Sequence, residues 1–319
     1  MGDYAKLGKD QTENILKLYD IGSLRSFVAL SLGISNSNYK LETESGTYLL
    51  KVSNDKDQTQ LCSEQEILTY LQGTPFDYSI AAIPTLEGSL IYAIGEYFGV
   101  IFPFIEGIPP GPADHTCCEI GRAIGSLHAL KITPAELQEI RSHEEVGFGG
   151  AEILEYTKSD ECPADFRDNF NFIFKDKLNG WNEEEMQLGI VHGDLYYDNT
   201  LFAHNKLKVI LDWEQAGRGP LLLDLGICIG GTCLEKGRII QPLINSFLSG
   251  YGLSRSLPKE EEKLLNQAII LGLFSIARWR ISRFVEKDLD PLMRDSYKEL
   301  LYRASNFNIM IEMLKSEKK

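Results

Sequence analysis

The chain has 319 residues, 43% of them hydrophobic and 24% charged, a composition typical of a globular protein with a sizeable core. Its 46 acidic and 32 basic residues give a formal net charge of −14, which argues against a nucleic-acid-binding protein because such proteins cluster lysine and arginine. The longest apolar run, residues 268–277, is about half of the ~20 residues that a membrane span needs, so we expect a cytoplasmic protein that does not enter a membrane.

The first hundred residues predict a small antiparallel sheet with one helix. Runs rich in apolar, aromatic and β-branched residues indicate strands, and the turn-rich GISNS (33–37) and Gly46 separate the first three of them. One segment instead has leucine and isoleucine at helical spacing and ends at Gly73. In chain order we expect strands at 27–32, 38–45 and 47–53, a helix at 60–73, and a hairpin with strands at 89–95 and 98–107.

The cluster EGIPPGPAD (106–114) marks the expected domain boundary, because glycine and proline interrupt both helices and strands. Beyond it the chain is mainly helical, with short β segments at 191–202 and 207–213. Helices are expected at 114–130, 239–252, 258–285 and 293–315. The predicted fold class is therefore α+β, with a small antiparallel β-rich N-lobe (1–105) joined by a hinge to a larger, mainly helical C-lobe (106–319).

Two segments of the second lobe carry the side chains that suggest a reaction. VHGDLYYDNTLF (191–202) contains Asp194 and Asn199, and Asp212 follows in VILDWEQ, eighteen residues after Asp194. Phosphoryl transfer from a nucleotide to a hydroxyl needs a carboxylate that orients the hydroxyl and accepts its proton, and oxygen ligands that hold Mg²⁺ against the phosphates. Asp194 suits the first role, and Asn199 and Asp212 suit the second if a hairpin-like turn brings them to one edge.

The same reaction needs a cation on the phosphates. Lys51 ends the strand TYLLK, and Glu64 on the following helix is placed to pair with it and hold it there. Glu66 takes this role instead if the helix register is shifted. If neither glutamate paired with Lys51, the alternative interpretation would be that Lys51 is a solvated residue at the end of a strand.

This set of residues resembles the aminoglycoside phosphotransferase superfamily of small-molecule kinases. The resemblance rests on H-x-D-x-x-x-x-N followed by I-L-D-W, and it extends through GISNSNYKLETESGTYLLK, VIFPFIEG, IGRAIGSLHAL and AGRGPLLLDLGICI. Within the superfamily the chain is most similar to the homoserine kinase-like branch, which shares the opening G-I-S-N-S-N-Y and counterparts of Ala277, Arg278, Trp279 and Arg283. The resemblance implies a protein-kinase-like two-lobe fold that uses ATP and Mg²⁺.

The resemblance also implies site residues in both lobes. It makes Asp194 the catalytic aspartate, Asn199 and Asp212 the metal ligands, and Lys51 the phosphate-binding lysine with Glu64 as its partner. At the hinge, the Pro103 carbonyl and the Ile105 N–H would meet adenine, while Ser35, Asn36, Ser37 and Asn38 would cover the phosphates. The chain lacks the G-x-G-x-x-G, D-F-G and A-P-E motifs of protein kinases, which favours a small-molecule acceptor over a protein.

The candidate acceptor residues have structural alternatives. Arg278 and Arg283 would clamp a carboxylate of the acceptor, or they would pair with acidic residues such as Glu286 at the surface. Glu214 or Asp194 would bind an ammonium group of the acceptor. Tyr196 borders the catalytic residues and would shape the acceptor pocket, or it would only contribute to packing.

Three further polar residues are expected to be structural. His192 is expected to lie under the catalytic loop and bond to its backbone, and His128 is expected to be a hydrogen-bonded core histidine. Asp224 lies among apolar residues, where a carboxylate needs partners; the resemblance implies that it braces the catalytic loop through backbone N–H groups.

The predicted function is ATP-dependent phosphorylation of a hydroxyl on a small metabolite, with homoserine as the leading acceptor. Choline, ethanolamine, methylthioribose, an aminoglycoside or a protein hydroxyl are alternative acceptors for the same chemistry. A nucleotide-binding pseudokinase is a further alternative, disfavoured because every catalytic position holds the expected residue. No pattern in the sequence indicates an oligomeric state or a preference for ATP over GTP.

Overall fold

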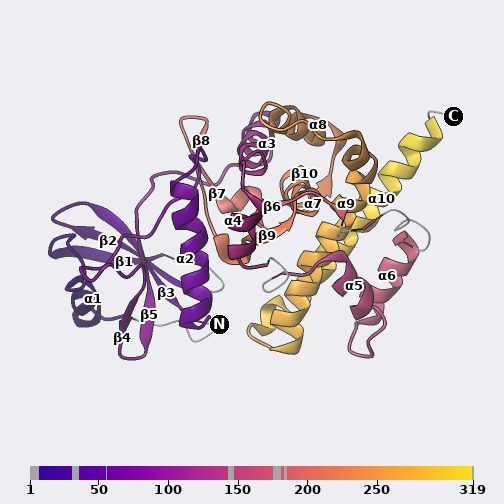
Figure 1. Cartoon of the computed structure of the whole chain (residues 1–319). Coiled ribbons are helices and arrows are strands. Elements are labelled where there is room, and N and C mark those ends of the chain that lie inside the picture. Colours follow the sequence, from indigo (N-terminus) through magenta and orange to yellow (C-terminus); the bar gives the residue numbers. More distant parts are fainter. Residues whose placement is uncertain are drawn as a thin grey trace. The chain divides into compact units, whose positions relative to one another are not determined.

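The computed structural model describes residues 7–30, 36–54, 56–142, 147–174, 181–182 and 185–317. The chain divides into two compact units, Met1–Glu106 and Gly107–Lys319. The division falls one residue after the boundary that the Gly-Pro cluster predicted. Each unit has its own architecture (Figure 1).

The first unit is built on a five-stranded antiparallel sheet with the strand order β1-β2-β3-β5-β4. Every strand predicted for this region is present, although the fourth is shorter than expected because only Tyr92–Ile94 pairs with its neighbour. The strands are β1 (Leu24–Leu30), β2 (Asn36–Thr43), β3 (Thr47–Ser53), β4 (Tyr92–Ile94) and β5 (Tyr97–Pro103), and the helices are α1 (Lys9–Leu16) and α2 (Gln58–Gln72).

The first unit has a hydrophobic cluster on each face of its sheet. Leu61 of α2 packs with Val100 of β5 on one face, and a second cluster, which includes residues of α1, lies on the other face. Leu41, Leu50, Val52 and Ile101 point to this face from three adjacent strands and are fully buried, which the period-two pattern of these strands requires. The predicted helix α2 begins at the N-cap Asp57, whose carboxylate accepts the N–H of Gln60 at 2.8 Å. The sequence analysis missed α1, since a helix of eight residues is too short to show a clear period.

The second unit is mainly helical, and short antiparallel strand pairs lie among its helices. The helices are α3 (Asp114–His128), α4 (Pro134–Glu139), α5 (Gly150–Tyr156), α6 (Ala164–Phe174), α7 (Leu221–Thr232), α8 (Gln241–Tyr251), α9 (Lys259–Arg280) and α10 (Tyr297–Glu317). The strand pairs are β6 (Leu188–Val191) with β9 (Gly217–Pro220), β7 (Thr200–Ala203) with β8 (Lys206–Ile210), and β10 (Leu234–Glu235) with β11 (Arg238–Ile239). Among the described residues, no helix has the length and apolar character to cross a membrane.

Helix α7 is the central helix of the second unit, and every residue from Leu221 to Thr232 is buried. The sequence analysis did not predict this helix, because a helix that is apolar on all sides has no amphipathic period. Gly226 lets α7 approach α9 closely: a Cβ atom at this position would lie 2.2 Å from the carbonyl oxygen of Ala268. The approach matters for the site because α7 also carries Asp224.

We expect the Gly226→Ala variant to unfold with a free energy about 1–3 kcal/mol lower than that of the wild type, because the added methyl group meets backbone atoms of α9 that cannot rotate away. Chemical denaturation measures this difference. Gly111→Ala is the matched control, since a Cβ atom at Gly111 meets no atom within 4 Å. Equal stability of Gly226→Ala and the wild type would contradict the close packing of α7 on α9.

Candidate active site

The two predicted metal ligands lie at the same end of the β7–β8 hairpin. Asn199 immediately precedes β7, and Asp212 follows two residues after the last residue of β8. The N–H of Leu211 donates to the carbonyl of Asn199 at 2.8 Å, which closes this end of the hairpin. The hairpin arrangement expected from the sequence is therefore the one that brings these two segments together.

Asp194 lies in the loop between β6 and β7, and His192 fixes this loop to the end of the hairpin. The Nε2 of His192 lies 2.9 Å from the carbonyl oxygen of Leu211, and its Nδ1 accepts the N–H of Asp194 at 3.3 Å. These two bonds require the proton to be on Nε2. The ring is fully buried and packs on Trp213, with 4.8 Å between ring centroids, so His192 has the structural role expected for it.

The side chain of Asn199 is oriented by the catalytic loop. Its Nδ2 donates to the carbonyl of Asp194 at 2.8 Å, which leaves the Oδ1 atom as the part of the amide that would serve as a metal ligand. Asp212 is exposed and has a left-handed backbone (φ 61°, ψ 63°), a conformation that costs a residue other than glycine free energy and is often kept at functional sites.

The carboxylates of Asp194 and Asp212 repel each other. Burial raises the pKa of Asp194 well above its usual value, and the negative charge of Asp212 raises it further, while the positive charge of Arg280 lowers it. A divalent cation would relieve the repulsion between the two carboxylates, and Asp and Asn oxygens are the ligand atoms that Mg²⁺ prefers. The residues present therefore fit a magnesium site.

A buried hydrogen-bond network centred on Asp224 supports the catalytic loop, the segment between β6 and β7 that carries Asp194. Asp224 accepts the backbone N–H of His192 at 3.1 Å and that of Gly193 at 2.8 Å, as the resemblance implied. Its Oδ2 also lies 3.0 Å from the Nε2 of His128, whose Nδ1 lies 3.0 Å from the hydroxyl of Tyr251. Although burial alone would raise the pKa of Asp224, the hydrogen bond and charge of His128 and the N–H of Gly193 hold it below its usual value.

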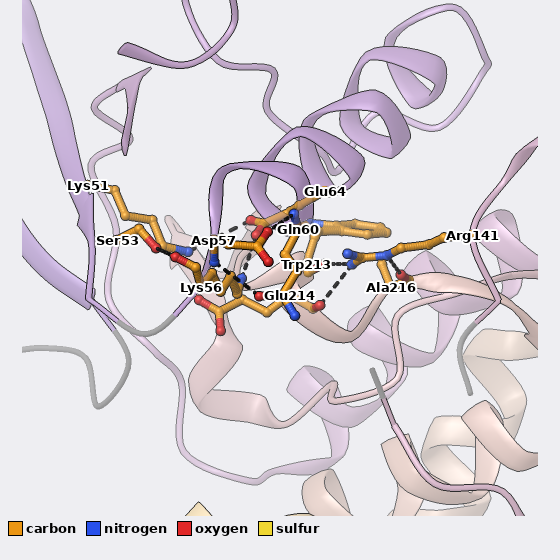
Figure 2. A network of polar contacts seen from close by, with 10 residues as sticks. All are labelled: Lys51, Ser53, Lys56, Asp57, Gln60, Glu64, Arg141, Trp213, Glu214 and Ala216. Atoms are coloured by element: carbon orange, nitrogen blue, oxygen red, sulfur yellow. Dashed lines mark hydrogen bonds and ion pairs between the residues drawn. The ribbon is translucent and has the colours of Figure 1, made fainter. Parts of the chain in front are cut away.

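Arg141 supports the segment that follows Asp212, a role that the sequence analysis missed. Its guanidinium donates to the carbonyl of Ala216 through Nε and to that of Glu214 through Nη2, both at 2.8 Å (Figure 2). No sequence pattern indicates these contacts, because Arg141 lies in a loop and its partners lie 73 and 75 residues away in the chain.

In the first unit, the side chain of Glu64 is 2% exposed, and its carboxylate forms ion pairs with two lysines, whereas the sequence predicted one. Its Oε1 lies 3.8 Å from the Nζ of Lys51, as predicted, and its Oε2 lies 2.7 Å from the Nζ of Lys56 (Figure 2). Glu66 is exposed, so the alternative helix register is not needed. The contact of Lys56 with Glu64 was not predicted, since a lysine in a short loop is ordinarily expected to be solvated.

The other described residues predicted to bind the nucleotide lie on strand β2 or at or just after the end of strand β5. Asn36 and Ser37 are buried at the start of β2, and Asn38 faces Lys51 in the β2–β3 register. Ser35 lies outside the described residues. Pro103 is exposed at the end of β5, and Ile105 is half-buried two residues later.

The predicted acceptor residues differ in their surroundings. Tyr196 is half-buried and its ring lies against α7, where a Cβ atom on Gly231 would be 2.4 Å from it. Arg278 donates to Glu286 at 2.9 Å and stacks on Tyr156, with its guanidinium carbon 3.9 Å from the ring centroid. This pairing with Glu286 is the surface alternative that the sequence left open for Arg278.

Two further arginines lie near the end of α9. Arg283 stacks on Trp279 at 5.2 Å. Arg280 donates to the carbonyl of Ser296 at 2.8 Å and lies 3.6 Å from Glu299. Its charge stabilises the ionised forms of Asp194 and Tyr196, lowering both pKa values that burial raises. The charge of Arg280 therefore acts on the loop that carries Asp194.

Known proteins with similar sequences are kinases. Residues 26–256 match the phosphotransferase enzyme family. The chain is 26% identical to a homoserine kinase of Rhizobium meliloti (strain 1021) over 295 residues, which cover 91% of this chain and 88% of the relative. It is 25% identical to a homoserine kinase of Agrobacterium fabrum over 271 residues, which cover 83% and 82%.

Solved structures of small-molecule kinases have the same fold. A microcompartment-associated aminopropanol kinase matches with a TM-score of 0.71 at 18% identity, over 97% of this chain and 98% of its own. The amicoumacin kinase hAmiN, solved with AMP-PNP, Ca²⁺ and Ami, matches with a TM-score of 0.67 at 15% identity, over 92% and 93%. The chain therefore belongs to the phosphotransferase enzyme family and is a small-molecule kinase with a hydroxyl acceptor and a protein-kinase-like two-lobe fold.

Proposed function

We propose that this kinase transfers the γ-phosphoryl group of ATP, with Mg²⁺, to the side-chain hydroxyl of a small amino acid, and that homoserine is the acceptor. The observation that carries the proposal is the convergence of Asp194, Asn199 and Asp212 at one end of the β7–β8 hairpin, with a repulsion between carboxylates that a divalent cation would relieve. The names of the similar curated relatives support the choice of homoserine.

Asp194 would orient the acceptor hydroxyl and take its proton. Burial, the first cause of the raised pKa of Asp194, favours the protonated form of its carboxyl and so favours transfer of the proton to it. His192 and Asn199 hold the loop on both sides of Asp194, so little reorganisation is needed when the acceptor binds.

Asn199 and Asp212 would hold Mg²⁺, and Lys51 with Glu64 would bind the phosphates from the first unit. The bound cation supplies electrostatic stabilisation of the charge on the transferring phosphoryl group. Pro103 and Ile105 would bind adenine through backbone atoms, and Ser35, Asn36, Ser37 and Asn38 would cover the phosphates.

The acceptor would be recognised by its two charged groups. Its ammonium suits an acidic side chain such as Glu214 or Asp194, and its carboxylate suits an arginine, which binds carboxylates with two parallel hydrogen bonds. Arg278 and Arg283 are the arginines implied by the resemblance, and Arg280 joins them because its charge acts on Asp194. Tyr196 would form part of the wall beside the reacting hydroxyl.

The test of the proposed function is ADP release from Mg-ATP with homoserine, choline, ethanolamine, methylthioribose, kanamycin or buffer alone. We expect stimulation by homoserine and none by the acceptors that lack a carboxylate. Stimulation by a different acceptor would keep the chemistry and replace homoserine. ATP binding without turnover on any acceptor would favour the pseudokinase.

For the acceptor site we expect Arg280→Gln and Arg283→Gln to raise KM for homoserine by about tenfold or more, the size of a lost charge-assisted hydrogen bond, with a smaller change in kcat. Arg278→Gln should have a smaller effect on KM than Arg280→Gln, because the guanidinium of Arg278 already donates to the Glu286 carboxylate at 2.9 Å, whereas that of Arg280 lies 3.6 Å from the Glu299 carboxylate. Steady-state kinetics with homoserine varied at saturating ATP measure these changes.

Arg294→Gln is the control for these variants, since Arg294 is exposed and pairs with Asp288 at 3.5 Å. An unchanged KM in both Arg280→Gln and Arg283→Gln, with homoserine still turned over, would contradict the arginine assignment and leave the kinase function intact.

A further inference from the structure

Glu64 is the centre of a cluster of three charged side chains in the first unit. The carboxylate is buried on α2, and the side chains of Lys51 and Lys56 are also largely buried, with 12% and 15% exposed. Each lysine approaches a different oxygen of the carboxylate: Lys56 lies at Oε2 and Lys51 at Oε1. The two contacts differ in length by more than an ångström, and the shorter one, 2.7 Å, belongs to Lys56.

The two contacts have different physical roles. An ammonium–carboxylate contact of 2.7 Å is a short charge-assisted hydrogen bond, which fixes the orientation of the carboxylate. A separation of 3.8 Å is an ion pair without a hydrogen bond, so the Nζ of Lys51 is attracted to Glu64 without being tied to it. Lys56 therefore fixes the Glu64 carboxylate through a hydrogen bond, and Glu64 attracts Lys51 only through its charge.

Lys56 itself is fixed by the loop that leads into α2. Its carbonyl accepts the hydroxyl of Ser53 at 3.3 Å, and the next residue, Asp57, is the N-cap of α2. Because Glu64 lies two turns further along the same helix, the start of α2 and the middle of α2 are linked through the Lys56 side chain.

We infer that Lys56 is a positioning residue for nucleotide binding: it fixes the carboxylate of Glu64, so that the other oxygen of Glu64 directs Lys51 to the phosphates. This inference rests on the proposed function, since it assigns Lys51 to ATP. It differs from the assignment of Lys51 and Glu64 alone, because Lys56 acts through Glu64 and does not itself contact the nucleotide.

A double-mutant cycle tests whether Lys56 acts on nucleotide binding through Glu64. We expect Lys56→Met to lower kcat/KM for ATP and to weaken Mg-ATP binding by about tenfold, as for the loss of one charge-assisted hydrogen bond. Lys56→Arg should keep most of both, because a guanidinium also donates to a carboxylate. In a Glu64→Gln background, Lys56→Met should cause no further loss, since the carboxylate through which it acts is gone.

Lys9→Met is the matched control, because Lys9 pairs with Glu13 at 3.7 Å on the exposed surface of the same unit. Thermal unfolding checks that each variant is folded, and Lys56→Gln replaces Lys56→Met in the cycle if the latter does not fold. A further loss from Lys56→Met in the Glu64→Gln background, or a Lys56→Met variant that behaves like Lys9→Met, would overturn the inference. Absence of ATP binding in the wild type would instead overturn the proposed function.

Discussion

Asp194→Ala should lower the rate of ADP release by on the order of 10³-fold, because it removes the group that orients the hydroxyl and accepts its proton. Mg-ATP binding should survive, since Lys51, Glu64, Asn199 and Asp212 are unchanged. Single-turnover kinetics and a direct binding titration with Mg-ATP measure the two quantities separately.

Asp198→Ala is the control for this prediction, since Asp198 lies four residues later in the same loop and is exposed. It should retain turnover close to that of the wild type, because the loop is held by His192 and Asn199 rather than by Asp198. Near-normal turnover by Asp194→Ala, with correct folding, would remove Asp194 from the mechanism and with it the central step of the proposed function.

The strands of the first unit could be predicted because they are rich in apolar, aromatic and β-branched residues and are separated by turn residues. Apolar residues at alternate positions, such as Leu50 and Val52, are visible in the sequence. In the structure these residues and Leu41 form the buried face of β2 and β3. Helix α7 was missed for the opposite reason. It is buried on all sides, so its sequence carries no amphipathic period, and its close approach to α9 at Gly226 is visible only in the structure.

The motif-bearing part of the site could be predicted because its residues are close in sequence. Asp194, Asn199 and Asp212 lie within nineteen residues, and a single hairpin brings them together. Arg141 could not be predicted, because its partners lie 73 and 75 residues away in the chain. Lys56 lies only eight residues from Glu64, but a lysine in a short loop is ordinarily expected to be solvated. The choice among Arg278, Arg280 and Arg283 likewise depends on which way each side chain points from the end of α9 or from the π-helical segment Ile281–Glu286 that continues it, which the sequence leaves open.

Asp224→Ala should lower the free energy of unfolding by roughly 3–5 kcal/mol, the cost of removing one partner from a buried charged network. The backbone N–H groups of His192 and Gly193 and the ring of His128 would lose their acceptor in a region closed to water. Turnover should fall as well, because the loop that carries Asp194 would lose its support. Chemical denaturation and steady-state kinetics measure the two effects.

Asp224→Asn gives a sharper test, because it keeps the size of the side chain and removes the charge. The pKa of Asp224 is lowered in the folded protein, so its contribution to stability is complete above the pKa of an unfolded aspartate, about 3.9, and is lost as the pH falls through the lower folded value. The difference in unfolding free energy between the wild type and Asp224→Asn should therefore be largest near neutral pH and narrow in acid.

Asp295→Asn is the matched control, since Asp295 is exposed and pairs with Lys298 three residues later on the surface. Its effect should be below about 1 kcal/mol, as is usual for an exposed ion pair. If Asp224→Asn matched the wild type at neutral pH, the catalytic loop would be held by His192 and the hairpin alone. The buried network of Asp224, His128 and Tyr251 would then have no part in positioning Asp194.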